Sequence, residues 1–222
     1  LVIGRKGETK VKVSSRLAPP VLAWGYLCEY SYNFLPDGSY RLDFSAKLQN
    51  DGFELPPLQC VGFEMTLPET VSRAAWFGLG PGEAYPDSKE AQKVGYYKLP
   101  LEALSTNYTR PQENGNRYEV RRAAFYDTKM CGILVAGAPL FDFSAHRYTA
   151  EALEKAPHPY QIEECDEVVL NLNWKSAPLG SNSCGPLPNE ALLIKPQNFK
   201  FSMNFKGFVG GEMNDATFFT ML

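Results

Sequence analysis

The sequence lacks the features that mark several large classes of protein. No stretch approaches the ~20 consecutive apolar residues that a membrane-spanning helix needs, and residues 1–10 lack the apolar segment and cleavage pattern of a signal peptide. The net charge is only −3, and no segment carries a run of charges of one sign. Because nucleic-acid surfaces depend on clustered Lys and Arg, we expect neither nucleic acid nor a membrane as a partner.

Cysteine and histidine are also sparse. The chain has two histidines, and none of its five cysteines lies in a CxxC pair or at metal-ligand spacing from a histidine. We therefore predict no metal site and no cofactor, and we expect free thiols that are mostly buried. Free thiols are typical of a reducing compartment, so the composition favours a cytoplasmic protein.

The abundant residues are those of a β-sheet protein with many turns, with 14 Phe, 12 Tyr, 18 Gly and 17 Pro. A helical turn is expected within residues 87–95 and a short helix at 150–155, capped by Thr149. Residues 213–222 show no regular pattern. Since the chain has no internal repeat and no linker, we predict one all-β domain over residues 1–222. Apolar–polar alternation and β-rich runs predict strands at residues 9–17, 21–34, 40–48, 58–67, 71–77, 117–126, 131–136, 141–148, 168–174 and 199–205.

One turn carries an unusual density of hydrogen-bonding side chains. Residues 111–117 (PQENGNR) combine a carboxylate, three amides and a guanidinium around Asn114-Gly115, a pair that tolerates positive φ. These groups could bind the hydroxyls of a sugar, or they could satisfy each other and brace the turn. Bracing is the favoured interpretation, because buried polar groups generally find partners inside the protein. Arg117 and Arg147 are expected to pair with carboxylates such as Glu113 or Asp142.

Four motifs, in order along the chain, resemble those of bacterial-type β-galactosidases of glycoside hydrolase family 2. They are WFGLGPGEAYPD at 76–87, PQENGNR at 111–117, FSAHRY at 143–148 and GSNSCGP at 180–186. The resemblance covers roughly residues 10–208 and implies the C-terminal, galactose-mutarotase-like domain of those enzymes. That domain is a large antiparallel β-supersandwich, here with one or two short helices. The family domain begins with further strands, so we expect this one to be incomplete at its N-terminal side, with residues 209–222 as a tail.

The resemblance also implies a function. In the resembled enzymes the catalytic acid and nucleophile are glutamates of a (β/α)₈ barrel, and this sequence has no strand–helix alternation to build one. We therefore expect no catalytic residue and no glycoside hydrolysis by this chain alone. It would pack on the barrel, shape the active-site mouth and support sugar binding and assembly. Its partners would be the rest of the polypeptide or a large subunit, a galactoside and a further copy of itself. The alternative is a stand-alone carbohydrate-binding or aldose 1-epimerase-like protein.

The residues expected to contact sugar, or to lie near the active site, all belong to these motifs. Trp76 either stacks on a sugar or fills the core. His146 lies beside Arg147, a cation that would lower its pKa. Cys184 stands where some relatives have a tryptophan of the galactose subsite, and a cysteine supplies no aromatic platform for a sugar. The full set is Trp76, Glu113, Asn114, Arg117, His146, Arg147, Ser183 and Cys184.

Overall fold

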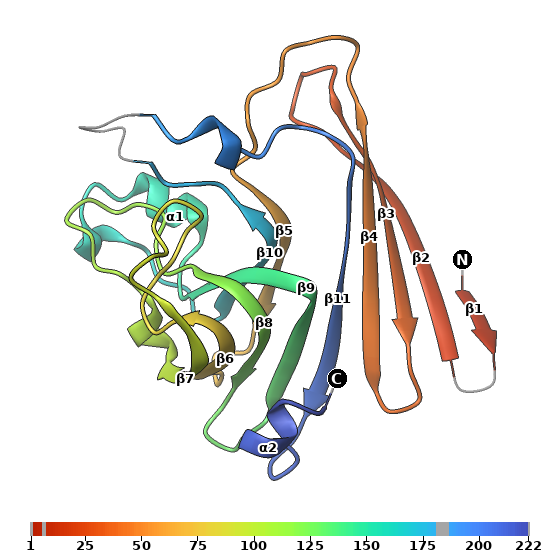
Figure 1. Cartoon of the computed structure of the whole chain (residues 1–222), viewed down its shortest axis with the longest axis vertical. Helices are drawn as coiled ribbons and strands as arrows, with labels where there is room; N and C mark the ends of the chain where they lie inside the picture. Colours follow the sequence, from red (N-terminus) through yellow and green to blue (C-terminus); the bar gives the residue numbers. More distant parts are fainter. Residues whose placement is uncertain (1, 6–7, 181–186, 222) are drawn as a thin grey trace.

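The computed structural model describes residues 2–5, 8–180 and 187–221, and within them the chain is built almost entirely from antiparallel strands (Figure 1). The short α-helices are α1 (Ala150–Lys155) and α2 (Asp215–Phe218), and a 3₁₀ turn, η1, spans Leu101–Leu104. The strands are β1 (Val2–Arg5), β2 (Glu8–Leu17), β3 (Gly25–Phe34), β4 (Ser39–Gln49), β5 (Cys60–Leu67), β6 (Arg73–Gly80), β7 (Lys93–Pro100), β8 (Arg117–Tyr126), β9 (Gly132–His146), β10 (Val168–Ser176) and β11 (Phe199–Phe208).

The described strands join into one strongly curved sheet. Its main path runs β1-β2-β3-β4-β11-β9-β8-β6-β7, and a branch leads from β9 through β10 to β5. Every pairing between these strands is antiparallel. The prediction of a large antiparallel all-β fold with one or two short helices is therefore confirmed.

Strand β9 creates the branch, because it belongs to two parts of the sheet. β8 pairs with both halves of β9 on one side, whereas on the other side the first half pairs with β11 and the second half with β10. The change occurs around Gly137, where a Cβ atom would lie only 2.8 Å from the carbonyl carbon of Leu140. The sequence predicted two strands, at 131–136 and 141–148. The structure has one bent strand, since the interruption at Gly137-Ala138-Pro139 bends the backbone without ending it.

The branch folds over the main sheet and closes an aromatic core. Phe63 of β5 lies 5.5 Å from Phe44 of β4 and 5.3 Å from Phe201 of β11, measured between ring centroids. Trp174 of β10 stacks on Phe201 at 5.5 Å. Burying a large apolar side chain of this kind stabilises a fold by roughly 1.5–3 kcal/mol. This layer of rings is what holds the branch to the sheet.

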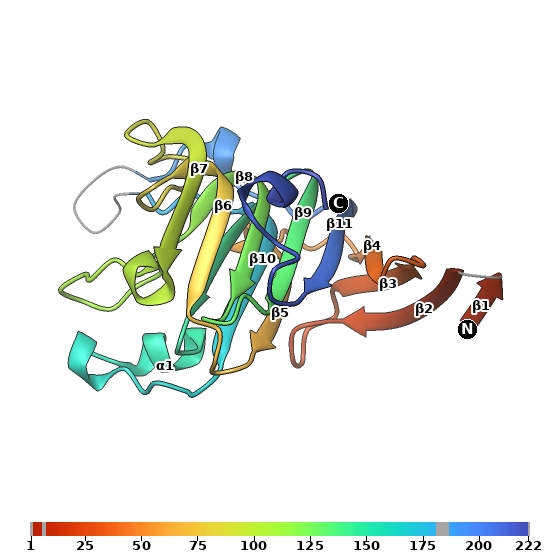
Figure 2. The same ribbon diagram turned by 90° about the horizontal axis from the view of Figure 1, so that it is seen from below.

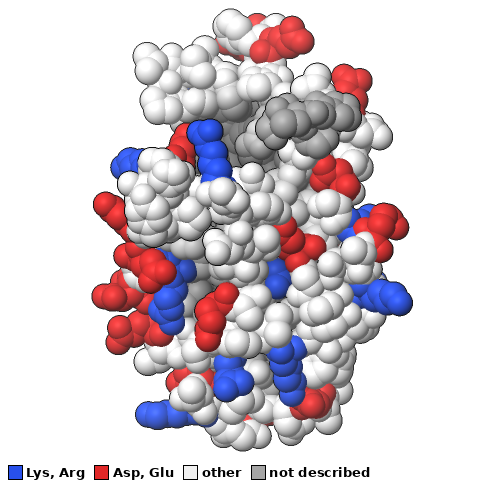
Figure 3. Space-filling model, turned by 90° about the vertical axis from the view of Figure 1, so that its left-hand side faces the viewer, with Lys and Arg blue, Asp and Glu red and all other residues white. Residues whose placement is uncertain are grey.

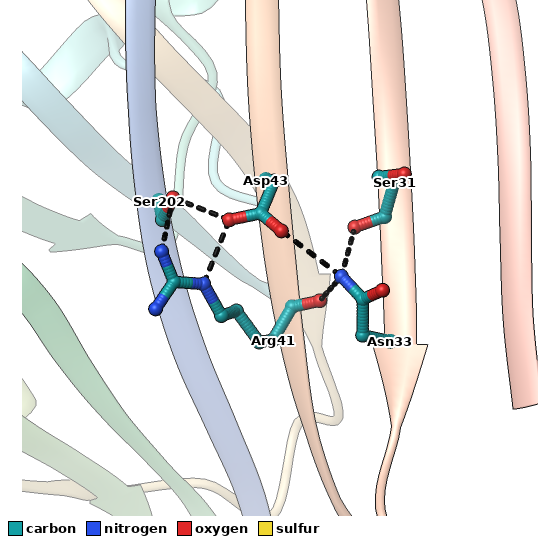
Figure 4. A network of polar contacts seen from close by, with 5 residues as sticks. All are labelled: Ser31, Asn33, Arg41, Asp43 and Ser202. Atoms are coloured by element: carbon teal, nitrogen blue, oxygen red, sulfur yellow. Dashed lines mark hydrogen bonds and ion pairs between the residues drawn. The ribbon is translucent and has the colours of Figure 1, made fainter. Parts of the chain in front are cut away.

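The opposite face of the main sheet is polar and paired within itself. Figure 4 shows Arg41 and Ser202 hydrogen-bonded to Asp43, at 2.7 and 2.6 Å, while Asn33 donates to the other carboxylate oxygen at 3.0 Å. Exposed ion pairs of this kind contribute only about 0–1 kcal/mol. These pairs distinguish the outer face of the sheet from its inner face, because β3, β4 and β11 turn apolar side chains inward and these polar groups toward solvent.

The apolar inner face continues beyond the branch that covers it. β5 pairs only with β10 among the described strands, so one of its edges is open. Figures 1 and 2 show β2 and β3 extending past β5. On this part of the sheet Val13 is 44% exposed and Leu17 64% exposed, and a groove of about 500 Å³ runs between Tyr30 and Val61. An uncovered apolar face next to an open strand edge is a surface that another segment can cover.

Three other expectations meet the structure differently. The α1 helix and its Thr149 cap are confirmed. Residues 87–95, where the sequence predicts a helical turn, lead into β7. This edge strand is partly exposed on both faces, so its sequence lacks apolar–polar alternation. The irregular segment at 213–222 contains α2, which Asn214 caps and whose Phe218 is fully buried. Cysteines are less buried than expected, since of those described only Cys28 is buried. No described helix is long and apolar enough to cross a membrane.

Candidate functional site

The turn at 111–117 is held mainly by its own amides. The Asn114 side chain accepts from the Thr106 amide at 3.0 Å and donates to the Gln112 carbonyl at 2.9 Å and to the Tyr148 hydroxyl at 3.0 Å. The Asn116 side chain donates to the Ala84 carbonyl at 2.8 Å. Both asparagines are buried. These contacts support the bracing interpretation for the two residues.

Glu83, from the first motif, fastens the turn from outside. One of its carboxylate oxygens accepts from the Gly115 amide at 2.8 Å, and the other accepts from the Tyr108 hydroxyl. Gly115 has φ of +74°, and a Cβ at this position would lie 2.8 Å from the Leu104 carbonyl oxygen. Glu83 belongs to the motif at 76–87 but is not among the predicted site residues, because the sequence alone does not show which groups its carboxylate meets.

Arg117 is part of the core. Its guanidinium donates to the carbonyls of Leu104 and Gly115, at 3.1 and 2.8 Å, and lies 5.2 Å from the ring of Trp76. Burial lowers the pKa of Arg117 to about 10. Trp76 is 0% exposed and donates to the Leu79 carbonyl at 2.9 Å, so it fills the core and offers no face to a sugar. The expected pairing of Arg117 with a carboxylate is wrong, because Nη1 donates to backbone carbonyls and Nε has no hydrogen-bond partner among the described residues.

Arg147 behaves in the same way at the surface. Its guanidinium donates to the backbone carbonyls of Glu69, Val71 and Asp166, tying the end of β9 to two loops. The expected carboxylate partner is wrong here too. The arginine therefore joins backbone segments at this edge of the molecule.

His146 is held in one tautomer. Its Nε2 lies 3.0 Å from the Asn114 carbonyl, which can only accept, so Nε2 carries the proton. Nδ1 then accepts from the Ser105 hydroxyl at 3.1 Å. Burial lowers the pKa of His146, and the charge on Arg117 adds to that effect. The sequence predicted the direction of this pKa shift, but its causes are burial and the charge on Arg117, not the charge on Arg147. His146 lines a cavity of about 320 Å³.

A larger cavity, of about 940 Å³, lies on the other side of the turn. Its floor is the outer face of β5, β10 and β9, where Glu64, Asn171 and Ser144 face each other in register across the three strands. These residues were not predicted, because they come from distant parts of the sequence. The alternation Leu170-Asn171-Leu172-Asn173 was the available indication, since it gives a buried strand one polar face.

Glu113 projects from the turn into this cavity. The buried Tyr85 donates its hydroxyl to the Glu113 carboxylate at 3.2 Å. The carboxylate is open to water but surrounded by protein, so desolvation raises the pKa of Glu113, and the charge on Glu83 adds to it. Glu113 and His146 line different cavities, which does not favour their joint use as acid and base on one sugar.

Asp142 lies on the same face of β9 as Ser144, two residues before it. It is 3% exposed, sits opposite Asn173 in the β9–β10 register and accepts from the Glu119 amide at 3.2 Å. Burial raises the pKa of Asp142 to about 7, against the lowering effect of the hydrogen bond from the Glu119 amide. This carboxyl is a buried titratable group within the sheet.

The segment that leads into the motif at 180–186 lies at the rim of the large cavity. Asp87, the last residue of the first motif, accepts from the amides of Leu179 and Gly180 at 3.1 and 2.7 Å. Leu179 lines the cavity. Ser183 and Cys184, which were expected near the active site, lie outside the described residues. Charges of both signs are interspersed on the described part of the neighbouring face, without a broad patch of Lys and Arg (Figure 3).

Comparison with known proteins agrees with the motifs. The β-galactosidase of Actinobacillus pleuropneumoniae is 30% identical over 88% of this chain, that of Arthrobacter sp. is 36% identical over 57%, and that of Kluyveromyces lactis is 29% identical over 87%. The chain spans only 13–19% of the length of these relatives. The crystal structure of an aldose epimerase homologue from C. elegans superposes with a TM-score of 0.46 and 9% identity, covering 95% of this chain and 69% of that one.

The family comparison extends over most of the chain. The family described as the β-galactosidase small chain matches residues 3–205, which includes the motifs at 76–87, 111–117, 143–148 and 180–186. This range runs from β1 to β11, so it takes in the turn, both cavities and the core around Trp76. The chain belongs to the β-galactosidase small-chain family.

Proposed function

We propose that this chain is the non-catalytic small-chain part of a β-galactosidase, which packs on the catalytic part and supports galactoside hydrolysis there. The observation that carries the proposal is the uncovered apolar face of β2 beside the open edge of β5. The exposed Val13 and Leu17 and the groove between Tyr30 and Val61 form a surface suited to a partner segment. The much greater length of the relatives supports a partner within the same enzyme.

The docking surface can be tested by a pair of substitutions on β2. Val13→Asp places a charge on the apolar face, and Ser14→Asp places the same charge on the opposite face of the same strand. Since Val13 is 44% exposed, the chain itself should keep its fold. We expect Val13→Asp to reduce, by about tenfold or more, the activity recovered when the chain is expressed with a β-galactosidase that lacks this region. Ser14→Asp should leave that activity within about twofold. Equal recovery by both variants would refute this docking surface.

The isolated chain is expected to have no β-galactosidase activity. Its described residues form an antiparallel sheet with two short α-helices, without the repeated strand–helix units of a catalytic barrel. The measurement is release of chromophore from a chromogenic galactoside by the purified chain. Turnover that persists through purification and is lost in Glu113→Gln would contradict the prediction, because it would place a catalytic carboxylate in this chain.

A second candidate is a carbohydrate-binding protein that acts by itself. The observation that favours it is the 940 Å³ cavity with its polar floor, since a site of this size can hold a sugar without help from another chain. The two candidates differ in one result. The accessory part restores activity to a truncated β-galactosidase, whereas a self-sufficient binding protein binds sugar and restores nothing.

A further inference from the structure

We propose that the polar cavity between the 111–117 turn and the β5–β10–β9 floor binds a neutral pyranose sugar through Glu64, Glu113 and Asn171. This rests on the proposed function, because it names the sugar-contacting surface of the small chain. The argument has three steps, which concern the hydrogen-bonding capacity of the cavity, its apolar walls and its charge.

The cavity keeps hydrogen-bonding capacity that the rest of the region uses up. On the turn, Asn114, Asn116 and Arg117 all bond to neighbouring protein groups. In the cavity, the side chains of Glu64 and Gln112 make no hydrogen bond to the described residues. The Asn171 Nδ2 and Ser144 Oγ atoms are 3.5 Å apart, at the limit of a hydrogen bond. Carboxylates and amides that are free to bond in a concave site are suited to a ligand rich in hydroxyl groups.

The walls of the cavity supply the apolar part of a sugar site. Pro111 of the turn, Leu153 of α1, Pro157 and Leu179 all border it. A pyranose has hydroxyls at its edge and C–H groups on its faces, so it needs acceptors on one side and apolar contact on another. The volume of about 940 Å³ lies within the range of ligand sites, roughly 300–1,000 Å³.

The charge of the cavity selects among sugars. Glu64 and Glu113 face it from opposite sides, from the floor and from the turn, while Arg110, Glu154 and Lys155 also border it. Carboxylates accept strong hydrogen bonds from sugar hydroxyls, but they repel a uronate or a sugar phosphate. With two carboxylates able to face the ligand, a neutral sugar fits the site better than an acidic one.

The experiment measures sugar binding to the chain directly. Side-chain amide resonances of the labelled protein are followed by NMR during titration to ~100 mM with galactose, methyl β-galactoside or galacturonate, because single sugars bind proteins weakly. We expect galactose to shift the Asn171 amide and to bind about tenfold more tightly than galacturonate at pH 8. Glu113→Gln should weaken galactose binding about fivefold and reduce the discrimination against galacturonate. Asn171→Leu should abolish the saturable shifts of the remaining cavity amides. Glu29→Gln, on the outer face of β3, is the matched control.

Each outcome decides something. Absence of saturable shifts with galactose, in a chain whose amide spectrum is that of a folded protein, overturns the proposal. So does an unchanged galactose affinity in both Glu113→Gln and Asn171→Leu. If the chain restores activity to a truncated β-galactosidase but binds no sugar in the cavity, only this inference fails. If it binds sugar but restores nothing, the accessory function fails and the cavity remains a sugar site.

Discussion

Replacing Arg117 by alanine is expected to lower the free energy of unfolding by about 3–5 kcal/mol, which is the largest loss that we predict for a single substitution. The side chain is 2% exposed, and its removal leaves the Leu104 and Gly115 carbonyls without their donor. A buried polar group left unpaired costs about 1–3 kcal/mol. The lost contact with Trp76 adds the cost of a cavity. The total free energy of unfolding of a domain is only about 5–15 kcal/mol, so the variant should be marginally stable.

The measurement is a urea midpoint on the wild type, Arg117→Ala and Arg117→Lys. Lysine keeps the charge but lacks the planar fork, so Arg117→Lys should recover only part of the loss. Arg110→Ala, at an exposed arginine a few residues earlier, is the matched control and should change stability by less than about 0.5 kcal/mol. Where Arg117→Ala is still folded, it should bind galactose as the wild type does. A normal midpoint together with lost sugar binding would show that Arg117 contacts ligand.

Asp142→Asn is expected to make the chain more stable at pH 8 and to flatten its pH dependence. The pKa of Asp142 is raised by burial from 3.8 to about 7, so between these values the folded chain holds a proton that the unfolded chain has lost. Stability from this group is therefore complete below pH 4 and is lost as the pH rises toward 7. Three pKa units correspond to at most about 4 kcal/mol. Asparagine cannot ionise and still accepts from the Glu119 amide.

The check is a set of urea midpoints between pH 4 and pH 8 for the wild type and Asp142→Asn. The difference between them should grow with pH and should vanish, or change sign, near pH 4. Comparing the two proteins removes the contribution of His146, whose lowered pKa acts in the opposite direction, by reducing stability as the pH falls below about 6.5. Asp166→Asn, at an exposed aspartate, is the control and should show no growing difference. Parallel curves for the wild type and Asp142→Asn would mean that Asp142 is not a buried acid.

Local patterns predicted much of the fold. The alternation in β4 and β11 places one face in the core, and the Thr149 cap begins α1 where expected. They could not show that β9 is one strand, because its two halves are joined by pairing with strands far away in sequence. β7 was missed for a related reason, since an edge strand that is half exposed on both faces shows no alternation.

The candidate site was predicted less completely than the fold. The turn was identified from its residue types, but the partners of Arg117 and Arg147 were not. These partners are backbone carbonyls, which every residue has, so no residue type indicates them. The burial of Trp76 could not be predicted either, because the motif is the same whether its tryptophan lines a binding site or fills the core. The floor of the large cavity depends on the register of β5, β10 and β9, which no local pattern encodes.

The position of β11 has a consequence for how the protein folds during synthesis. β11 lies between β4 and β9, and its Ser202 bonds to Asp43, 159 residues earlier in the chain. Until the ribosome has released this strand, the β2–β3–β4 hairpins and the β6–β9 region have no strand to join them into one sheet. The nascent chain must keep both regions from aggregating through their unpaired edges until β11 has emerged. Closure at such long sequence separation also predicts slow folding, and it makes the pairing of β11 the step that joins the two parts of the sheet.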